Sequence, residues 1–329
     1  MGKVISSIKN GLFGSVFIAI LLHMLPSITI AQDYPIKPLR LVVPYPPGGA
    51  VDLTARLLSQ RLAQALGQTI VIDNRPGAAG HLGAEQVSKA SADGYTLLYT
   101  VGAELAMRQS LPGSIDLLRD LTPIASVAAS VSCIVARPNL PLGSMQELLE
   151  LARRNPGKLS FGSAGIGSTH HLTGELLREM GVSLMHVPYK GVAPAMTALL
   201  SGETDLAITN LAMAMPQLRQ GKLKLLAITQ SNRFEGAPGV PPVTEALTGF
   251  NMPVAWYGFF APPGLNAVIS AKLAGEIGRT VSSAEVRNRL TDASMSPLFT
   301  SGEGMINLIR DTAASYARIV RVAGIRLDG

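Results

Sequence analysis

Residues 39–67 read LRLVVPYPPGGAVDLTARLLSQRLAQALG, and this segment indicates the class of fold. Its first five residues, apolar except for Arg40, are typical of a strand, and residues 44–49 form a turn rich in proline and glycine. Leu58, Leu62 and Leu66 then recur at helical spacing, and the segment ends on a glycine, a common residue at a helix C-terminus. The segment therefore predicts a strand, a glycine-rich turn and a helix in succession.

The same alternation continues along the chain. Apolar runs at 69–72 and 95–99 enclose a helical pattern at 83–90, and this order predicts a parallel sheet with helices on both faces. A second set of strands begins near residue 133, and helical patterns dominate from about residue 265 to the end, including 302–323. The fold class that we expect is α/β throughout.

The first 31 residues have the features of a secretory signal peptide. Two lysines and no acid precede an uncharged apolar run at 11–22, and Thr29 and Ala31 fit the small positions before a cleavage site. The apolar run is shorter than the roughly 20 residues that span a bilayer, so we expect no stable membrane insertion. We therefore predict a signal peptide at 1–31 and a protein released into a bacterial periplasm.

Length, charge and cysteine content restrict the possible functions. Removal of 31 of the 329 residues leaves 298, a size that usually divides into two domains. The formal charge of +6 includes Lys3 and Lys9, and the remaining basic residues are spread too thinly for a nucleic-acid partner. Cys133 is the single cysteine, which excludes an internal disulfide; we expect it to be a buried small hydrophobic residue.

A weak internal repeat suggests the kind of ligand. Residues 42–52 and 160–169 each contain a strand end, a glycine-rich turn and the start of a helix. Ligands of open parallel sheets bind beyond the carboxyl ends of the strands, where a helix N-terminus offers unpaired N–H groups and partial positive charge. Two such turns facing each other across a cleft would bind an anion through the backbone, without arginine or lysine.

Three other kinds of site fit these residues less well. The second turn has His170 where a dinucleotide-binding turn has its third glycine, and the first lacks the lysine of a phosphate loop. A metal pair of His171 and Glu175 has the right helical spacing but no third ligand nearby. A hydrolase using Ser168 and His171 lacks the usual nucleophile motif and an obvious acid to orient the histidine. We predict neither metal nor cofactor.

Several polar residues near strand ends have both a structural and a functional interpretation. Asp52 is either the N-cap of its helix or a residue that shapes the binding loop. Ser168 and Thr169 either cap the next helix or give hydroxyls to a ligand carboxylate. Glu104, a solvated residue or one that favours a ligand amino group, and Asn210 follow two further strands. Trp256 and Tyr257 are expected in the core.

Seven sequence runs, in order, resemble one family: the Bug-type solute receptors, extracytoplasmic binding components of tripartite tricarboxylate transporters. They cover nearly all of the chain after residue 33. The matching runs are YPIKPLRLVVPYPPGGAVD at 34–52, DNRPGAAG at 73–80, DGYTL at 93–97, GSAGIGSTHHL at 162–172, HVPYKG at 186–191, PAMTALLSG at 194–202 and AGI at 323–325.

The resemblance implies a periplasmic-binding-protein-like fold, with two Rossmann-like α/β domains, two crossovers and a ligand cleft that closes like a flytrap. Domain one would comprise 32–131 and 254–329, and domain two 132–253. A small carboxylate would be held in the cleft, largely by main-chain groups. With the candidates argued above, the predicted ligand-binding residues are Tyr45, Pro47, Gly48, Gly49, Asp52, Glu104, Ala164, Gly165, Gly167, Ser168, Thr169, His171 and Asn210.

The resemblance further implies delivery of the ligand to the membrane subunits of such a transporter and no enzymatic activity. A receptor that reports to a signalling partner would use the same closure and stays an alternative; we expect a monomer. Glu104 and Arg108 are charged where we expect small or neutral residues in this family. The ligand class therefore stays open between di- or tricarboxylates, aromatic acids and amino acids.

Overall fold

A computed structural model describes residues 34–109 and 113–324. The chain divides into two units, residues 1–36 and 37–329. Of the first unit only Tyr34, Pro35 and Ile36 are described, and the Tyr34–Pro35 peptide bond is cis. The predicted signal peptide, residues 1–31, lies outside the described residues. All described helices and strands belong to residues 37–329.

A six-stranded sheet has the strand order β11-β4-β10-β3-β1-β2. Strands β1, β2 and β3 are parallel, whereas β10 is antiparallel to both of its neighbours and β11 is antiparallel to β4. The strands are β1 Leu39–Val43, β2 Ile70–Asn74, β3 Thr96–Val101, β4 Thr122–Ser130, β10 Ala255–Ala261 and β11 Met295–Ser301.

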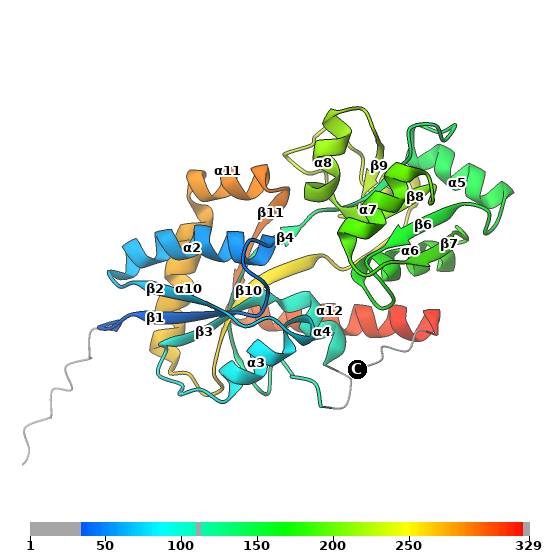
Figure 1. Ribbon diagram of the computed structural model, residues 1–329. Coiled ribbons are helices and arrows are strands. Elements are labelled where there is room, and N and C mark those ends of the chain that lie inside the picture. The colour runs from blue at the N-terminus through cyan, green and yellow to red at the C-terminus, as the bar shows by residue number, and fades with distance from the viewer. Residues whose placement is uncertain (1–33, 110–112, 325–329) are drawn as a thin grey trace, which may run out of the picture. The chain divides into compact units, whose positions relative to one another are not determined.

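Helices cover both faces of this sheet (Figure 1), as the strand–helix alternation predicts. Helix α2 packs on α10 on one face, and α3, α4 and α12 lie on the other. The helices are α2 Ala50–Leu66, α3 His81–Ser88, α4 Gly102–Arg108, α10 Ala267–Ser282, α11 Ala284–Asp292 and α12 Gly302–Ala323, and a 3-10 turn, η1, spans Ala78–Gly80.

A five-stranded sheet follows the order β7-β6-β8-β5-β9, with β5 antiparallel to β8 and β9. Its core includes Cys133, which is fully buried as predicted. The strands are β5 Ser132–Ala136, β6 Ser160–Ser163, β7 Met185–Pro188, β8 Leu206–Asn210 and β9 Lys224–Ile228. The accompanying helices are α5 Met145–Arg154, α6 Thr169–Glu179, α7 Val192–Ser201, α8 Leu211–Arg219 and α9 Val243–Ala246.

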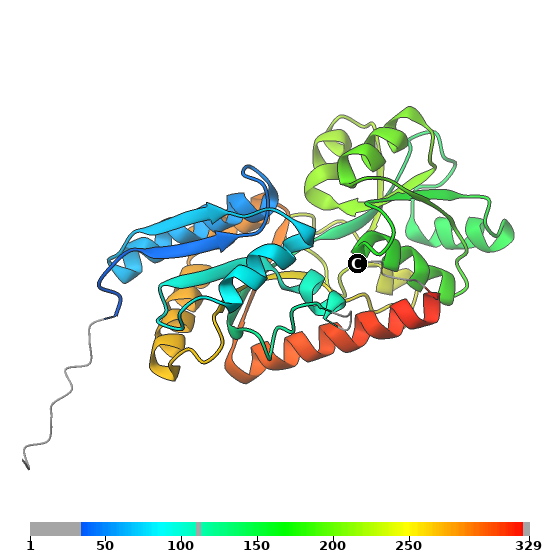
Figure 2. The same cartoon turned by 60° about the horizontal axis from the view of Figure 1, so that its bottom comes forward.

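The chain passes between the two sheets twice, once at Val131 and once through residues 229–254. Figure 2 shows the long helix α12 extending from the first sheet to α6 of the second, and Arg318 of α12 bonds Glu179 of α6 at 3.2 Å. The prediction of a parallel sheet is confirmed for the three strands from which it was made, β1, β2 and β3. Strands β5 and β10, which follow the two crossings, run antiparallel to both of their neighbours and were not predicted to do so.

Local patterns explain the helices that were predicted. Leu58, Leu62 and Leu66 are buried on one face of α2, and Gly67 ends that helix with φ of 66°. The pattern at 302–323 is confirmed as α12, which buries a stripe of one side chain per turn. Helices α10, α11 and α12 confirm that helices dominate the last part of the chain, and the strand between them that was not predicted is β11. Its edge position and a register shift after Pro297 remove the alternation that marks a strand.

Trp256 is confirmed in the core, where it positions α4. Its indole N–H donates to the Thr312 hydroxyl of α12 at 2.9 Å. Gly102 opens α4 directly against the indole, and a Cβ at that glycine would lie 1.9 Å from the Trp256 ring. This close approach fixes where α4 leaves the end of β3. No helix in the described part of the chain has the length and apolar character needed to cross a membrane.

Candidate functional site

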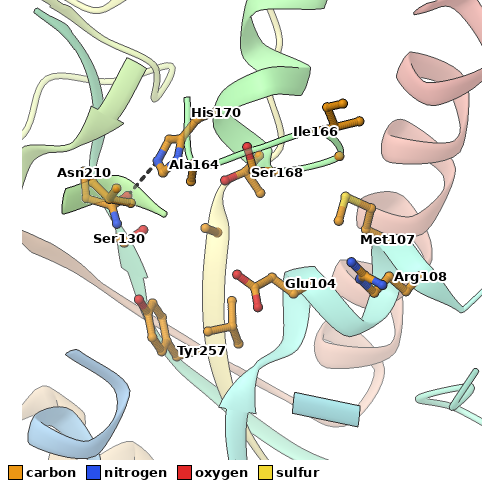
Figure 3. Close-up of a pocket in the computed structure, with 15 residues that line it drawn as sticks. Glu104, Met107, Arg108, Ser130, Ala164, Ile166, Ser168, His170, Asn210 and Tyr257 are labelled. Atoms are coloured by element: carbon orange, nitrogen blue, oxygen red, sulfur yellow. Dashed lines mark hydrogen bonds between the residues drawn. The ribbon is translucent and has the colours of Figure 1, made fainter. Parts of the chain in front are cut away.

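A cavity of about 320 Å³ is lined by residues from both sheets (Figure 3). Val101, Ser130 and Asn210 end strands β3, β4 and β8, so the cavity lies at carboxyl ends of strands, as expected for this class of fold. The first sheet and its helix α4 contribute Val101, Glu104, Met107, Arg108, Ser130, Ala255 and Tyr257; the second sheet and its helices contribute Ala164, Ile166, Gly167, Ser168, Thr169, His170, Val192 and Asn210.

The loop between β6 and α6 forms one wall of the cavity. Gly165 and Gly167 have φ of 123° and 74°, which disfavour residues with a side chain. Ser168 is the N-cap of α6, which confirms the structural interpretation of this residue. Its hydroxyl accepts a hydrogen bond from the His171 amide at 3.2 Å and donates one to the Gly165 carbonyl at 2.7 Å. The hydroxyl is therefore already used within the loop.

The same loop presents backbone donors to the cavity. The amides of Gly165, Gly167 and Ser168 bond within the loop and to nearby side chains. The amides of Ile166, Thr169 and His170 have no acceptor among the described residues. All three residues line the cavity, and two of them belong to the first turn of α6, where the helix dipole adds partial positive charge. This wall is therefore suited to an anionic group.

Two neutral imidazoles hold the loop from behind. His171 Nδ1 accepts from the Gly167 amide at 3.1 Å, so this nitrogen carries no proton, and the ring stacks on His186 at 4.0 Å. His186 Nε2 lies 2.6 Å from the Ser163 hydroxyl. Burial lowers the pKa of both histidines, that of His186 to about 4. Both rings are therefore uncharged at neutral pH.

These contacts leave no catalytic pairing of Ser168 with His171. The serine hydroxyl meets the backbone amide of His171, while the ring nitrogens face Gly167 and, at 3.5 Å, Glu175. Glu175 also pairs with Arg178 at 2.6 Å. Within residues 34–109 and 113–324, no group of three histidine, cysteine, aspartate or glutamate side chains is arranged to hold a metal.

His170 and Asn210 form a second polar pair at the cavity wall. His170 Nε2 lies 3.1 Å from Asn210 Oδ1, which accepts, so Nε2 carries the ring proton. Burial lowers the pKa of His170, and its Nδ1 has no partner in the described part of the chain. The amide nitrogen of Asn210 remains as a donor on the same wall.

The opposite wall carries the charged residues of the cavity. Glu104 lies in α4, partly buried, and its Oε2 accepts from the Tyr45 hydroxyl at 3.0 Å. Burial raises the pKa of Glu104, against the opposing effects of Tyr45 and the positive charge of Arg108. Burial and the Glu104 charge together raise the pKa of Tyr257 to about 12. The interpretation of Glu104 as a solvated residue is therefore wrong, because α4 turns it towards the cavity (Figure 3).

The first glycine-rich loop does not line this cavity. Asp52 is not the N-cap: α2 begins at Ala50, and the Asp52 carboxylate in its first turn reaches back to the Gly48 amide at 2.9 Å. The same carboxylate accepts from Arg56 and Asn74, each at 2.9 Å. The hydrogen bond from Arg56 contributes most to lowering the pKa of Asp52 to about 2. Asp52 thus fixes the shape of the loop that precedes its helix.

Six of the thirteen predicted ligand-binding residues line the cavity: Glu104, Ala164, Gly167, Ser168, Thr169 and Asn210. Tyr45 lies behind Glu104, and His171 and Gly165 support the second loop from outside the lining. Pro47, Gly48, Gly49 and Asp52 lie at the start of α2 and are not among the lining residues.

Sequence reasoning did not select several lining residues, among them Ser130, Ile166 and Tyr257. The position of Ser130 at the end of a strand is a signal of the kind that selected Asn210, but the unbroken apolar run around it concealed the strand boundary. Tyr257 is buried as predicted and also lines the cavity.

One family model matches most of the chain. Residues 54–325 match the model described as "Tripartite tricarboxylate transporter family receptor". The chain belongs to this receptor family. The match confirms the resemblance to Bug-type receptors, and it includes the second glycine-rich loop and the whole cavity lining.

Three solved structures resemble this receptor in both sequence and fold. The periplasmic binding protein BugD is 31% identical, with a TM-score of 0.72, and the match covers 89% of this chain and 99% of BugD. Rpa4515 of R. palustris, solved with adipate, is 31% identical with a TM-score of 0.76 over 89% and 99% of the two chains. MatC of Rhodopseudomonas palustris, solved with bound malate, is 33% identical with a TM-score of 0.67 over 88% and 100%. These similarities confirm the periplasmic-binding-protein fold.

Proposed function

We propose that this receptor captures a small carboxylate in the cavity and delivers it to the membrane subunits of a tripartite tricarboxylate transporter. The observation that carries the proposal is that three cavity-lining residues, Ile166, Thr169 and His170, have backbone amides without an acceptor among the described residues. Backbone amides at a helix N-terminus favour anions. The ligands of Rpa4515 and MatC, adipate and malate, are carboxylates of a size that such a cavity accommodates.

The proposal includes two domains and their closure. We assign residues 32–131 and 254–329 to domain one and 132–253 to domain two, since the strands of each sheet fall within these ranges. Ligand binding would stabilise a closed arrangement in which the loop Tyr45–Asp52 joins the cavity. The amides of Ala50 and Val51 have no acceptor among the described residues, so this loop would add donors to the carboxylate. The five predicted residues of this loop, which lie outside the lining, would act in this arrangement.

We place the receptor in the periplasm and assign it no catalysis. Export follows from the charged, apolar and small-residue segments of residues 1–31, and BugD, which it resembles, is a periplasmic binding protein. A binding role needs no nucleophile, which agrees with the engagement of the Ser168 hydroxyl by the backbone. Transport, as opposed to signalling, would show as co-purification with membrane subunits of the transporter.

A single amide can be removed to test the carboxylate site. Thr169 is the first residue of α6, and its predecessor is extended, with ψ of 157°, so proline fits this position. Thr169→Pro should weaken carboxylate binding by about tenfold or more, because one charge-assisted hydrogen bond is lost. The matched control is Ala284→Pro, at the exposed first position of the serine-capped helix α11, which should leave binding unchanged.

The ligand is found first by a thermal-shift screen of the purified protein against carboxylates and amino acids. A ligand at 100 times its dissociation constant adds roughly 2.7 kcal/mol to the free energy of unfolding, which raises the melting temperature by a few degrees. Calorimetry then gives the dissociation constants of both proline variants. If no carboxylate binds, or if both variants bind as tightly as the parent, the proposed site is wrong.

A further inference from the structure

Resting on the proposed function, we propose that the ligand carries an ammonium group as well as a carboxylate, and that Glu104 accepts the ammonium. The carboxylate would lie on the free amides of the β6–α6 loop, and the ammonium on the α4 wall opposite. The assignment narrows the ligand class to amino-carboxylates and makes Glu104 a specificity-determining residue.

The charged side chains that line the cavity both come from α4. Among the lining residues Glu104 is the single acid and Arg108 the single base, since the buried His170 is neutral. Figure 3 shows the Glu104 carboxylate directed into the space between α4 and the loop that carries Ser168. One wall therefore offers N–H donors and the other a carboxylate, which matches a ligand with one charge of each sign.

Only one oxygen of the Glu104 carboxylate accepts a hydrogen bond from the described residues. Its Oε2 accepts from Tyr45 at 3.0 Å, whereas Oε1 has no donor among the described residues. Arg108 acts on Glu104 through its charge alone, since no hydrogen bond or ion pair joins the two side chains. A partly buried carboxylate with an open oxygen is stabilised by a cation that enters the cavity.

Glu104 also disfavours a ligand that would place a carboxylate against the α4 wall. A ligand carboxylate placed against Oε1 would bring two like charges together in a site of restricted solvation, which is unfavourable. Binding such a ligand would require Glu104 to take up a proton or the ligand to avoid the α4 wall. An ammonium at the same place forms a charge-assisted hydrogen bond instead. Arg108 has no ion-pair partner among residues 34–109 and 113–324, so its guanidinium is available for a second carboxylate.

The test compares L-aspartate with succinate, which differ by one ammonium group, using calorimetry on the purified protein. The parent should bind aspartate at least about tenfold more tightly. Glu104→Gln, which preserves shape and removes charge, should weaken aspartate and strengthen succinate, so that the preference disappears. Glu150→Gln, an exposed charge-matched control on α5, should preserve it. Tyr45→Phe, which removes the bond that positions Glu104, should reduce it several-fold, and thermal melting verifies that each variant is folded.

The outcomes separate the two proposals. Succinate binding as tight as aspartate binding in the parent, or a preference that survives in Glu104→Gln, overturns the ammonium assignment while the carboxylate site stands. Failure of every carboxylate and amino-carboxylate to bind the folded parent overturns the proposed function itself, and this inference with it.

Discussion

The contact between Gly174 and Phe161 links the stability of the protein to the geometry of the cavity. A Cβ at Gly174 in α6 would lie 2.1 Å from Phe161 Cζ of β6, where ordinary contact begins at 3.4 Å, so helix and strand would have to separate by 1.3 Å. Phe161 has no room to yield: it is 1% exposed, and its ring stacks on His186 at 4.9 Å. His186 in turn stacks on His171.

The substitution Gly174→Ala should therefore destabilise the fold and loosen the ligand loop. Overpacking of a core costs typically about 1–3 kcal/mol, and the gain in helix propensity returns roughly 0.5–1 kcal/mol, so we expect a net loss of about 1 kcal/mol. Displacement of α6 would also strain the bond between the Gly167 amide and His171, and carboxylate affinity should fall by about tenfold.

Urea unfolding followed by circular dichroism measures the first effect, and calorimetry with the identified ligand the second. The control is Gly275→Ala in α10, where the nearest atoms are the flexible end of Arg279 at 3.8 and 3.9 Å. That variant should be more stable than the parent by about 0.5–1 kcal/mol. If Gly174→Ala were as stable as Gly275→Ala, the close packing of α6 on β6 would not exist as described.

Three further results follow from buried polar groups. The pKa of Asp52 is lowered from 3.8 to about 2, so Asp52→Asn should lower the free energy of unfolding in urea at pH 7 by about 2 kcal/mol. In the parent this contribution is present above pH 4 and disappears towards pH 2. The pKa of His186 is lowered from 6.5 to about 4, so the melting temperature should fall as pH drops through this range, and less in His186→Asn; an equal fall would contradict this. The buried thiol of Cys133, whose pKa burial raises, should react with a thiol reagent only after unfolding, and rapid reaction of native protein would contradict its burial.

Elements with a regular local pattern could be predicted from sequence. The leucine stripe of α2 and the stripe of α12 follow from helical spacing, and Ser168 is placed to cap α6 because a serine precedes an apolar helix. The glycines at 165 and 167 identified the loop, since their backbone conformation excludes side chains. Anion binding by backbone amides could be argued from these local features alone.

Features that depend on distant contacts could not be predicted. Tyr45 and Glu104 are 59 residues apart, and nothing in either local sequence indicates that their side chains meet. The sequence leaves Glu104 open between solvent and the ligand cleft, because the short segment around it has no strong pattern. In the fold, Gly102 packed on Trp256 turns α4 towards the cavity. Asp52 illustrates the same limit on a smaller scale: the helix starts two residues before it, and only the folded turn shows that it bonds back to Gly48.

The two walls of the cavity carry different information about the ligand. The β6–α6 loop binds through amides that any residue possesses, and the imidazoles behind it are neutral, so this wall distinguishes anions from other ligands but not one carboxylate from another. The α4 wall presents side chains, with Glu104 and Arg108 four residues apart on one helix and both lining the cavity. Selection between ligands of one family must therefore reside mainly on the α4 wall. Glu104 and Arg108 are accordingly the strongest indication in this chain of what its ligand is.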